Sequence, residues 1–179
     1  MSYYRTKTYI AGAWEEDQDA IEQLYKWNES DKFSLEFSNI HDFHQSRDDS
    51  LTCSIKDNLS KRMDNCKMFI LIVGPKTTSV TRGACYNCSN YKYSYYNGYT
   101  CSIHKSISNR SFIEFECEKA KLEYYNNNMK ILVLYNYSYV YRNYCPEALR
   151  YIGIHEAMKT GGSWDYNKVK LAFEKAKYN

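Results

Sequence analysis

The sequence lacks any apolar run long enough to cross a membrane. Its longest wholly apolar segment is Met68–Val73, whereas a transmembrane helix needs about 20 residues. Residues 1–7 are polar and have no apolar core of the kind that marks a secretory signal. We therefore expect a soluble, cytoplasmic protein with no membrane partner.

A strong charge of one sign is also missing. The chain has 24 lysines and arginines against 21 aspartates and glutamates, which gives a formal net charge of +3. This balance is too small to argue for nucleic acid by itself, and it is compatible with a small anionic ligand. Nucleic acid is therefore not an expected partner.

A disulfide framework is not expected either. The seven cysteines are an odd number, so they cannot all pair within one chain. Because no export signal precedes them, reduced thiols or metal ligation are the better interpretation of these residues.

The chain is long enough for one well-formed core and short for two, so residues 1–179 are predicted to form a single domain. Apolar periodicity predicts strands that alternate with helices, and no internal repeat is present. The predicted strands are residues 7–11, 33–38, 68–73 and 130–135, and the predicted helices are about 17–28, 51–63, 111–126, 146–151 and 165–177. This alternation is typical of an α/β fold with a doubly wound, mainly parallel sheet.

Residues 75–110 interrupt that alternation with a stretch rich in Thr, Ser, Asn, Tyr and Gly that has no apolar periodicity. Loops longer than about 15 residues are uncommon in compact domains unless something anchors them. Cys85-x-x-Cys88 and Cys101-x-x-His104 have the spacing of a tetrahedral zinc site, and the use of all four ligands would make the zinc structural. We therefore predict an insertion held by a zinc knuckle, the alternative being four incidental residues in a loop.

The helix predicted over residues 111–126 has a glutamate on its apolar side. At 100° per residue the apolar stripe contains Phe112, Ile113, Cys117, Ala120 and Tyr124. Glu114 and Glu118 lie opposite the stripe, as solvated residues should, but Glu116 falls within it. A carboxylate in that position must find a partner, raise its pKa, or open onto a ligand cleft.

The topology favours the cleft for Glu116. Ligands of doubly wound sheets bind outside the carboxyl ends of the strands, near the switch in strand order. Glu116 lies in the first two turns of a helix that follows the strand at 68–73, so it can face that crevice. The alternative is a glutamate at the edge of the stripe that reaches water or pairs with an arginine.

Residues 109–116 (NRSFIEFE) resemble the segment that leads to the catalytic glutamate in bacterial TIR-like (Toll/interleukin-1-receptor-like) proteins. The TIR-like subunit of Thoeris anti-phage systems is similar, and the opening at residues 8–28 and the segments MFILIVG and KILVLYN match in order and spacing. The resemblance spans most of residues 5–150. It implies a flavodoxin-like sheet and cleavage of the nicotinamide–ribose bond of NAD, with Glu116 as the catalytic residue.

Two loops and one helix position are the other candidates for contact with NAD. The loop after the first strand contains Ala11, Gly12 and Trp14, and glycine there permits close backbone approach, although no GxGxxG fingerprint is present. The alternative is an ordinary turn, with Trp14 covering the core instead of stacking on a base. Phe112 lies one turn before Glu116 and could line the same cleft.

The loop after the second strand contributes Asn39, His41 and Arg47. Arg47 is the best anion partner in this loop, since a guanidinium binds phosphate through two parallel hydrogen bonds. A salt bridge from Arg47 to Asp48 or Asp49 is the competing interpretation.

The resulting prediction is an NAD glycohydrolase or cyclase that makes an ADP-ribose-derived, cyclic signal in anti-phage immunity. The defence role, a phage trigger, a signal-receiving effector protein and assembly into homo-oligomers follow from the resemblance. Two other classes stay open, a catalytically silent TIR-like interaction module and an enzyme similar to nucleoside deoxyribosyltransferases. An RNA-binding zinc knuckle with stacking tyrosines is a further alternative, against which the small net charge argues.

Overall fold

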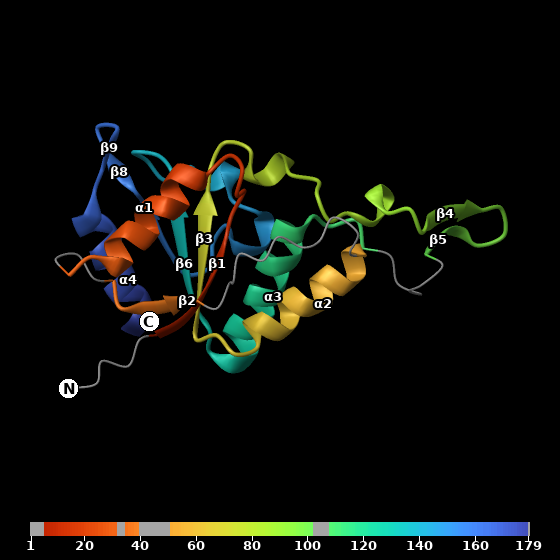
Figure 1. Cartoon of the computed structure of the whole chain (residues 1–179), viewed down its shortest axis with the longest axis horizontal. Coiled ribbons are helices and arrows are strands. Elements are labelled where there is room, and N and C mark those ends of the chain that lie inside the picture. Colours follow the sequence, from red (N-terminus) through yellow and green to blue (C-terminus); the bar gives the residue numbers. More distant parts are fainter. Residues whose placement is uncertain (1–5, 32–34, 40–50, 102–107, 179) are drawn as a thin grey trace.

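The computed structural model describes residues 6–31, 35–39, 51–101 and 108–178 (Figure 1). Its centre is a five-stranded sheet made of β1 (Thr6–Ala11), β2 (Phe37–Asn39), β3 (Met68–Val73), β6 (Lys130–Tyr135) and β7 (Ile154–Ala157). The strand order is β2-β1-β3-β6-β7, and every pairing in this sheet is parallel. The prediction of a doubly wound, parallel α/β sheet is confirmed, with the flavodoxin-like strand order.

Hydrophobic runs explain the two inner strands. All six residues of β3 are buried, as are five of the six in β6. A strand in the middle of a parallel sheet is covered on both faces, so it needs apolar side chains at successive positions instead of alternating ones. The continuous runs in the sequence therefore place β3 and β6 at the centre.

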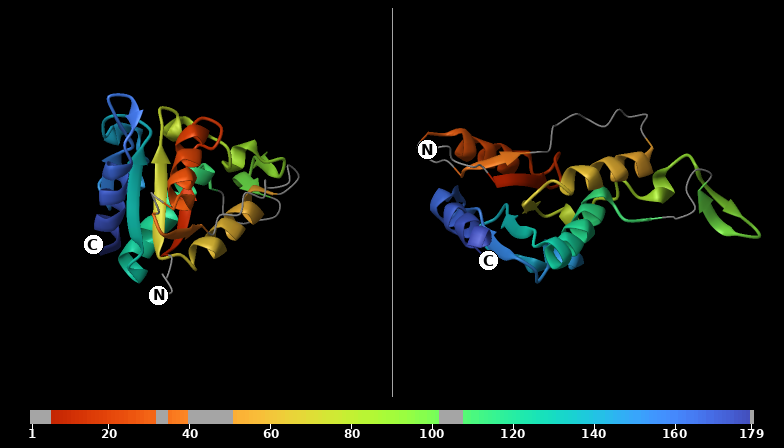
Figure 2. Two further views of the ribbon diagram at one scale, coloured as in Figure 1. Left: turned by 60° about the vertical axis from the view of Figure 1, so that its left-hand side comes forward. Right: turned by 90° about the horizontal axis from the view of Figure 1, so that it is seen from below.

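Four helices cover the sheet, two on each face (Figures 1 and 2). One core is built with α2 (Thr52–Met63) and α3 (Phe112–Asn127), and the other with α1 (Gln18–Glu29) and α4 (Tyr166–Tyr178). All four were predicted from apolar periodicity to within two residues at either end. None of the helices in the described part of the chain is long and apolar enough to span a membrane.

The sequence prediction differs from the structure at one strand, one helix and one missed strand. The strand expected at 33–38 begins only at Phe37, because Glu36 has a positive φ of 60° and leaves the extended conformation, and residues 33 and 34 lie outside the described residues. The helix expected at 146–151 is a single 3-10 turn, Glu147–Leu149. The edge strand β7 was missed because IHEA carries no apolar run, and a small hairpin of β8 (Lys159–Thr160) and β9 (Ser163–Trp164) follows it.

The insertion at 75–110 is not a featureless loop. It contains two 3-10 turns, Thr77–Ser79 and Cys85–Asn87, and an antiparallel hairpin of β4 (Tyr91–Ser94) and β5 (Gly98–Cys101). The hairpin projects away from the sheet, at the right of Figure 1. Its signal in the sequence was Asn97-Gly98 among alternating tyrosines, a pattern typical of hairpins. The turn itself is residues 95–97, and Gly98, with a positive φ of 66°, begins β5 opposite Ser94.

Tyrosine rings hold the hairpin together in place of an apolar core. Tyr93 lies directly across from Tyr99, and Tyr91 stacks on Tyr99 with 5.0 Å between ring centroids. At the base, the Cys85 amide donates to the Ser108 carbonyl at 3.0 Å, and the Phe112 amide donates to the Arg82 carbonyl at 2.8 Å. Backbone hydrogen bonds thus join the two ends of the insertion.

Candidate active site

The start of α3 fixes the orientation of Glu116. Ser111 caps the helix by accepting a hydrogen bond from the Glu114 amide at 3.2 Å, and the Glu114 carboxylate accepts one from the Ser111 amide at 2.7 Å. This reciprocal capping box sets the first turn, because both interactions require the same helical register. Glu114 is exposed, whereas Glu116, two residues later, turns toward the sheet.

Glu116 is buried against β1. Its carboxyl group is part of a side chain only 6% exposed, and it accepts a hydrogen bond from the hydroxyl of Tyr9. The ring of Tyr9 is fully buried and stacks on Phe69 in the neighbouring strand, with 5.8 Å between centroids. The glutamate predicted from the apolar stripe is therefore a buried carboxylate with a defined partner.

The electrostatics of Glu116 follow from this burial. Removal from water raises the pKa of the carboxyl group to about 7, because the charged form loses hydration, and the hydrogen bond from Tyr9 acts in the opposite direction. Among the residues that the structure describes, no lysine or arginine forms an ion pair with Glu116. The simpler interpretation, a glutamate that reaches water or pairs with an arginine, does not describe this side chain.

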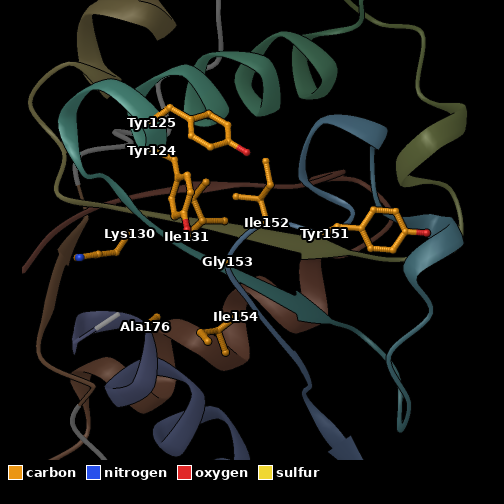
Figure 3. Close-up of a pocket in the computed structure, with 9 residues that line it drawn as sticks. All are labelled: Tyr124, Tyr125, Lys130, Ile131, Tyr151, Ile152, Gly153, Ile154 and Ala176. Carbon is orange, nitrogen blue, oxygen red and sulfur yellow. The ribbon is translucent and has the colours of Figure 1, made fainter.

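The pocket in Figure 3 lies elsewhere. It is at the amino ends of β6 and β7, where Lys130 begins one strand and Ile154 the other, with Tyr124 and Tyr125 of α3 on its rim. Ligands of parallel α/β sheets bind at the opposite, carboxyl edge. Neither Glu116 nor any other predicted site residue lines this pocket, so it is not the candidate active site.

The predicted NAD contacts after β1 pack into the core. Ala11 is 1% exposed and Gly12 is buried, with so little room that an added Cβ would lie 3.2 Å from the Ile72 Cβ. Trp14 is half-buried and packs against the core between the sheet and helices α1 and α4. In this structure Trp14 covers the core, and Gly12 serves close packing.

The structure describes some of the other predicted NAD contacts and not others. Phe112 is half-buried at the start of α3 and packs so closely on Gly83 of the insertion that a side chain at position 83 would overlap its ring. Asn39 ends β2. His41 and Arg47 lie outside the described residues. Of these predicted contacts, Phe112 alone lies on the helix that carries Glu116, one turn before it. Its contact with Gly83 joins the insertion to that helix.

A polar cluster at the carboxyl edge of the sheet was missed in the sequence. Asp17, in the loop after β1, is fully buried, and Asn136, directly after β6, donates to Asp17 Oδ1 at 3.1 Å and to Asp19 Oδ1 at 2.9 Å. Gly74, directly after β3, lies against Asp17, and an added Cβ would overlap the carboxylate. Burial raises the pKa of Asp17. The cluster ties three strand ends together at the switch point, and no periodic pattern in the sequence marks it.

The predicted zinc ligands are only partly described. The Cys88 amide donates to the Cys85 carbonyl at 2.9 Å, and the Ser108 amide donates to Cys85 Sγ at 3.2 Å. Cys101 ends β5 opposite Tyr91, and His104 lies outside the described residues. The described part of the chain contains no group of three metal-ligating side chains, so the structure does not show the zinc site expected from Cys85, Cys88, Cys101 and His104.

The fold and the buried glutamate define a flavodoxin-like α/β protein in which α3 carries a buried carboxylate on its side toward the sheet. Residues 1–82 match the family described as Thoeris protein ThsB, TIR-like domain. This match confirms the expected resemblance to the TIR-like subunit of Thoeris systems and supports a role in anti-phage defence. No curated protein matches the chain. The family match ends at residue 82, inside the insertion and before Glu116, so the role proposed for that residue rests on its surroundings in the structure.

Proposed function

We propose that the chain cleaves the nicotinamide–ribose bond of NAD, with Glu116 as the catalytic residue. The observation that carries this proposal is a carboxylate buried in an apolar helix stripe with Tyr9 as its hydrogen-bond partner and a pKa near neutrality. Carboxylates with strongly shifted pKa values concentrate at functional sites. Such a group lowers the stability of the fold, and it is retained where it contributes to activity. The Thoeris TIR-like match of residues 1–82 supports the same activity.

The chemistry requires one negative charge near the ribose. The bond between the ribose C1′ and the nicotinamide nitrogen breaks, its electron pair leaves with nicotinamide, and an oxocarbenium-like ribose remains. Glu116 would stabilise that positive charge in a low-dielectric site. Attack by water at C1′, with loss of a proton, gives linear ADP-ribose, whereas attack by a nitrogen of the tethered adenine gives a cyclic product.

Access to Glu116 is restricted in this structure, because the side chain is 6% exposed. NAD would therefore reach the carboxylate only after the side chains above it move. Phe112 packs on Gly83 of the insertion, so a partner that displaces the insertion would also displace the start of α3. We propose that a phage-derived trigger or self-association opens the site in this way and that a separate effector receives the product.

Product analysis tests the proposed function. Protein incubated with NAD, alone and with extract of phage-infected cells, is expected to release nicotinamide together with a product lighter than ADP-ribose by one water. A cyclic product is expected because a covered site excludes water and holds adenine close to the reacting carbon. Mass spectrometry separates this result from linear ADP-ribose, which would indicate NAD depletion. Consumption of deoxynucleosides instead of NAD would select the deoxyribosyltransferase alternative, and no consumption in either condition would favour the silent interaction module.

We also propose that the insertion binds one structural zinc ion through Cys85, Cys88, Cys101 and His104. The spacing supports it, as do the tight turn from Cys85 to Cys88 and the amide that donates to Cys85 Sγ. Elemental analysis of protein purified without chelators is expected to give one zinc per chain. Cys85→Ser should lower the metal content and speed proteolysis between residues 75 and 110, while Cys53→Ser on α2 should change neither. Wild-type protein without stoichiometric metal would end this proposal.

A further inference from the structure

Tyr9 places its hydroxyl group in the core beside the carboxylate of Glu116. It is in the middle of β1, between β2 and β3, and its register partner in β3 is Phe69. The two rings are nearly parallel, at 8°, and both side chains are fully buried. Phe69 is therefore both the strand neighbour and the stacking partner of Tyr9, and this contact fixes the plane of the ring, whose hydroxyl reaches Glu116 of α3.

The hydrogen bond from Tyr9 to Glu116 joins residues 107 positions apart in the sequence. A phenol usually finds a partner when buried, but a neutral carbonyl would serve that need. A carboxylate is a costly partner, because it must be desolvated as well. The pairing therefore calls for an explanation beyond the packing of β1 against α3.

The other titratable groups around this pair come from two more segments. The positive charge of Arg62, near the end of α2, lowers the pKa of Tyr9, whereas burial, the Glu116 charge and the Cys66 thiol raise it. Next to Glu116, the thiol of Cys117 has its pKa raised by burial. The phenol thus stays protonated as a hydrogen-bond donor at all working pH values, and Glu116 is the group of the pair that titrates near neutrality.

We infer that Tyr9 is a positioning residue for Glu116. The Tyr9 hydroxyl holds the Glu116 carboxylate in one orientation and favours the ionised form of that carboxylate. This inference rests on the proposed cleavage of NAD at Glu116. An oxocarbenium-like ribose is stabilised only by the charged carboxylate. Without the donor, burial alone would keep a larger share of Glu116 protonated and inactive at neutral pH.

Tyr9→Phe is the matched test, because it removes the hydroxyl and keeps the ring that stacks on Phe69. Loss of a hydrogen bond to a charged group is expected to move the ionisation of Glu116 up by about one pH unit. Because the ionised share of Glu116 at pH 7 would fall from about one half to about one tenth, the rate of NAD cleavage should fall about fivefold there and recover as the pH rises, with KM unchanged. Tyr135→Phe is the control, since it deletes another core hydroxyl, one that contacts His155 Nδ1 at 2.9 Å, and it should leave the profile in place.

A second measurement keeps this inference separate from the proposed function. Carbon-13 NMR of labelled glutamate side chains follows the titration of Glu116 directly, with Glu116→Gln identifying its signal. We expect a midpoint near 7 in the wild type and a higher one in Tyr9→Phe. An unchanged midpoint overturns the role of Tyr9, as does a rate loss that no pH restores. If wild-type protein cleaves no NAD, the proposed function fails while the NMR titration still decides the coupling.

Discussion

Glu116→Gln is expected to lower the rate of NAD consumption by at least about 100-fold in triggered protein, which is the scale of removing one group that stabilises transition-state charge. The amide has nearly the size of the carboxylate, and its oxygen can still accept the hydrogen bond from Tyr9. The substitution therefore removes the negative charge without a cavity. The effect is measured as the rate of nicotinamide release, which chromatography quantifies.

The neighbouring glutamates of α3 supply the controls. Glu118 is half-buried and lies 4.0 Å from Arg110 on the surface, and Glu114 is exposed and caps the helix. Glu118→Gln removes a weak surface pair, and Glu114→Gln keeps a side chain suited to the capping box. Both variants should retain most activity. Equal losses in all three would indicate a damaged helix, and full activity in Glu116→Gln would exclude this carboxylate from the mechanism.

The sheet could be predicted from the sequence wherever burial alone decides the residue type. The apolar runs of β3 and β6 are central because both faces of those strands are covered. The edge strand β7 has no such requirement and depends on Gly153, whose positive φ of 81° lets the chain pass close to Ile131. A single glycine carries too little information to identify a strand.

The candidate site was predictable at Glu116 but not at its partners. A carboxylate in an apolar helix stripe conflicts with its surroundings, and that conflict is visible within 16 residues of sequence. Tyr9 looks like any strand tyrosine, and only the register of β1 against β3 aims it at α3. Asp17 and Asn136 meet because β1, β3 and β6 end at the same edge. Contacts of this kind depend on topology, which local patterns do not contain.

The buried position of Glu116 has opposite consequences for the proposed catalysis and for the stability of the fold. A charge near the ribose is useful only where water is scarce, and water is scarce beneath α3 because the helix packs on the core there. The same packing opposes ionisation of the carboxyl group when no substrate is bound. A covered carboxylate is therefore expected to destabilise the resting fold at pH values where it is ionised.

Glu116→Gln should consequently stabilise the protein at alkaline pH although it removes activity. Burial raises the pKa of Glu116 from its ordinary value of 4.5 to about 7. A carboxyl group with a raised pKa binds its proton more tightly in the folded state, so its favourable contribution is complete below about pH 4.5 and is lost as the pH rises through 7. The wild type should lose roughly 2–3 kcal/mol of unfolding free energy relative to Glu116→Gln between about pH 5 and pH 8.5.

Urea unfolding of both proteins at those two pH values measures this difference. Other groups with shifted pKa values, such as His155 and Asp17, are present in both proteins and cancel in the comparison. Glu118→Gln should show no pH-dependent gain of this size, since its carboxylate is partly solvated. A constant difference between wild type and Glu116→Gln across the range would mean that Glu116 ionises normally in the folded protein. The charge would then be too well solvated to act as the desolvated carboxylate that the proposed cleavage requires.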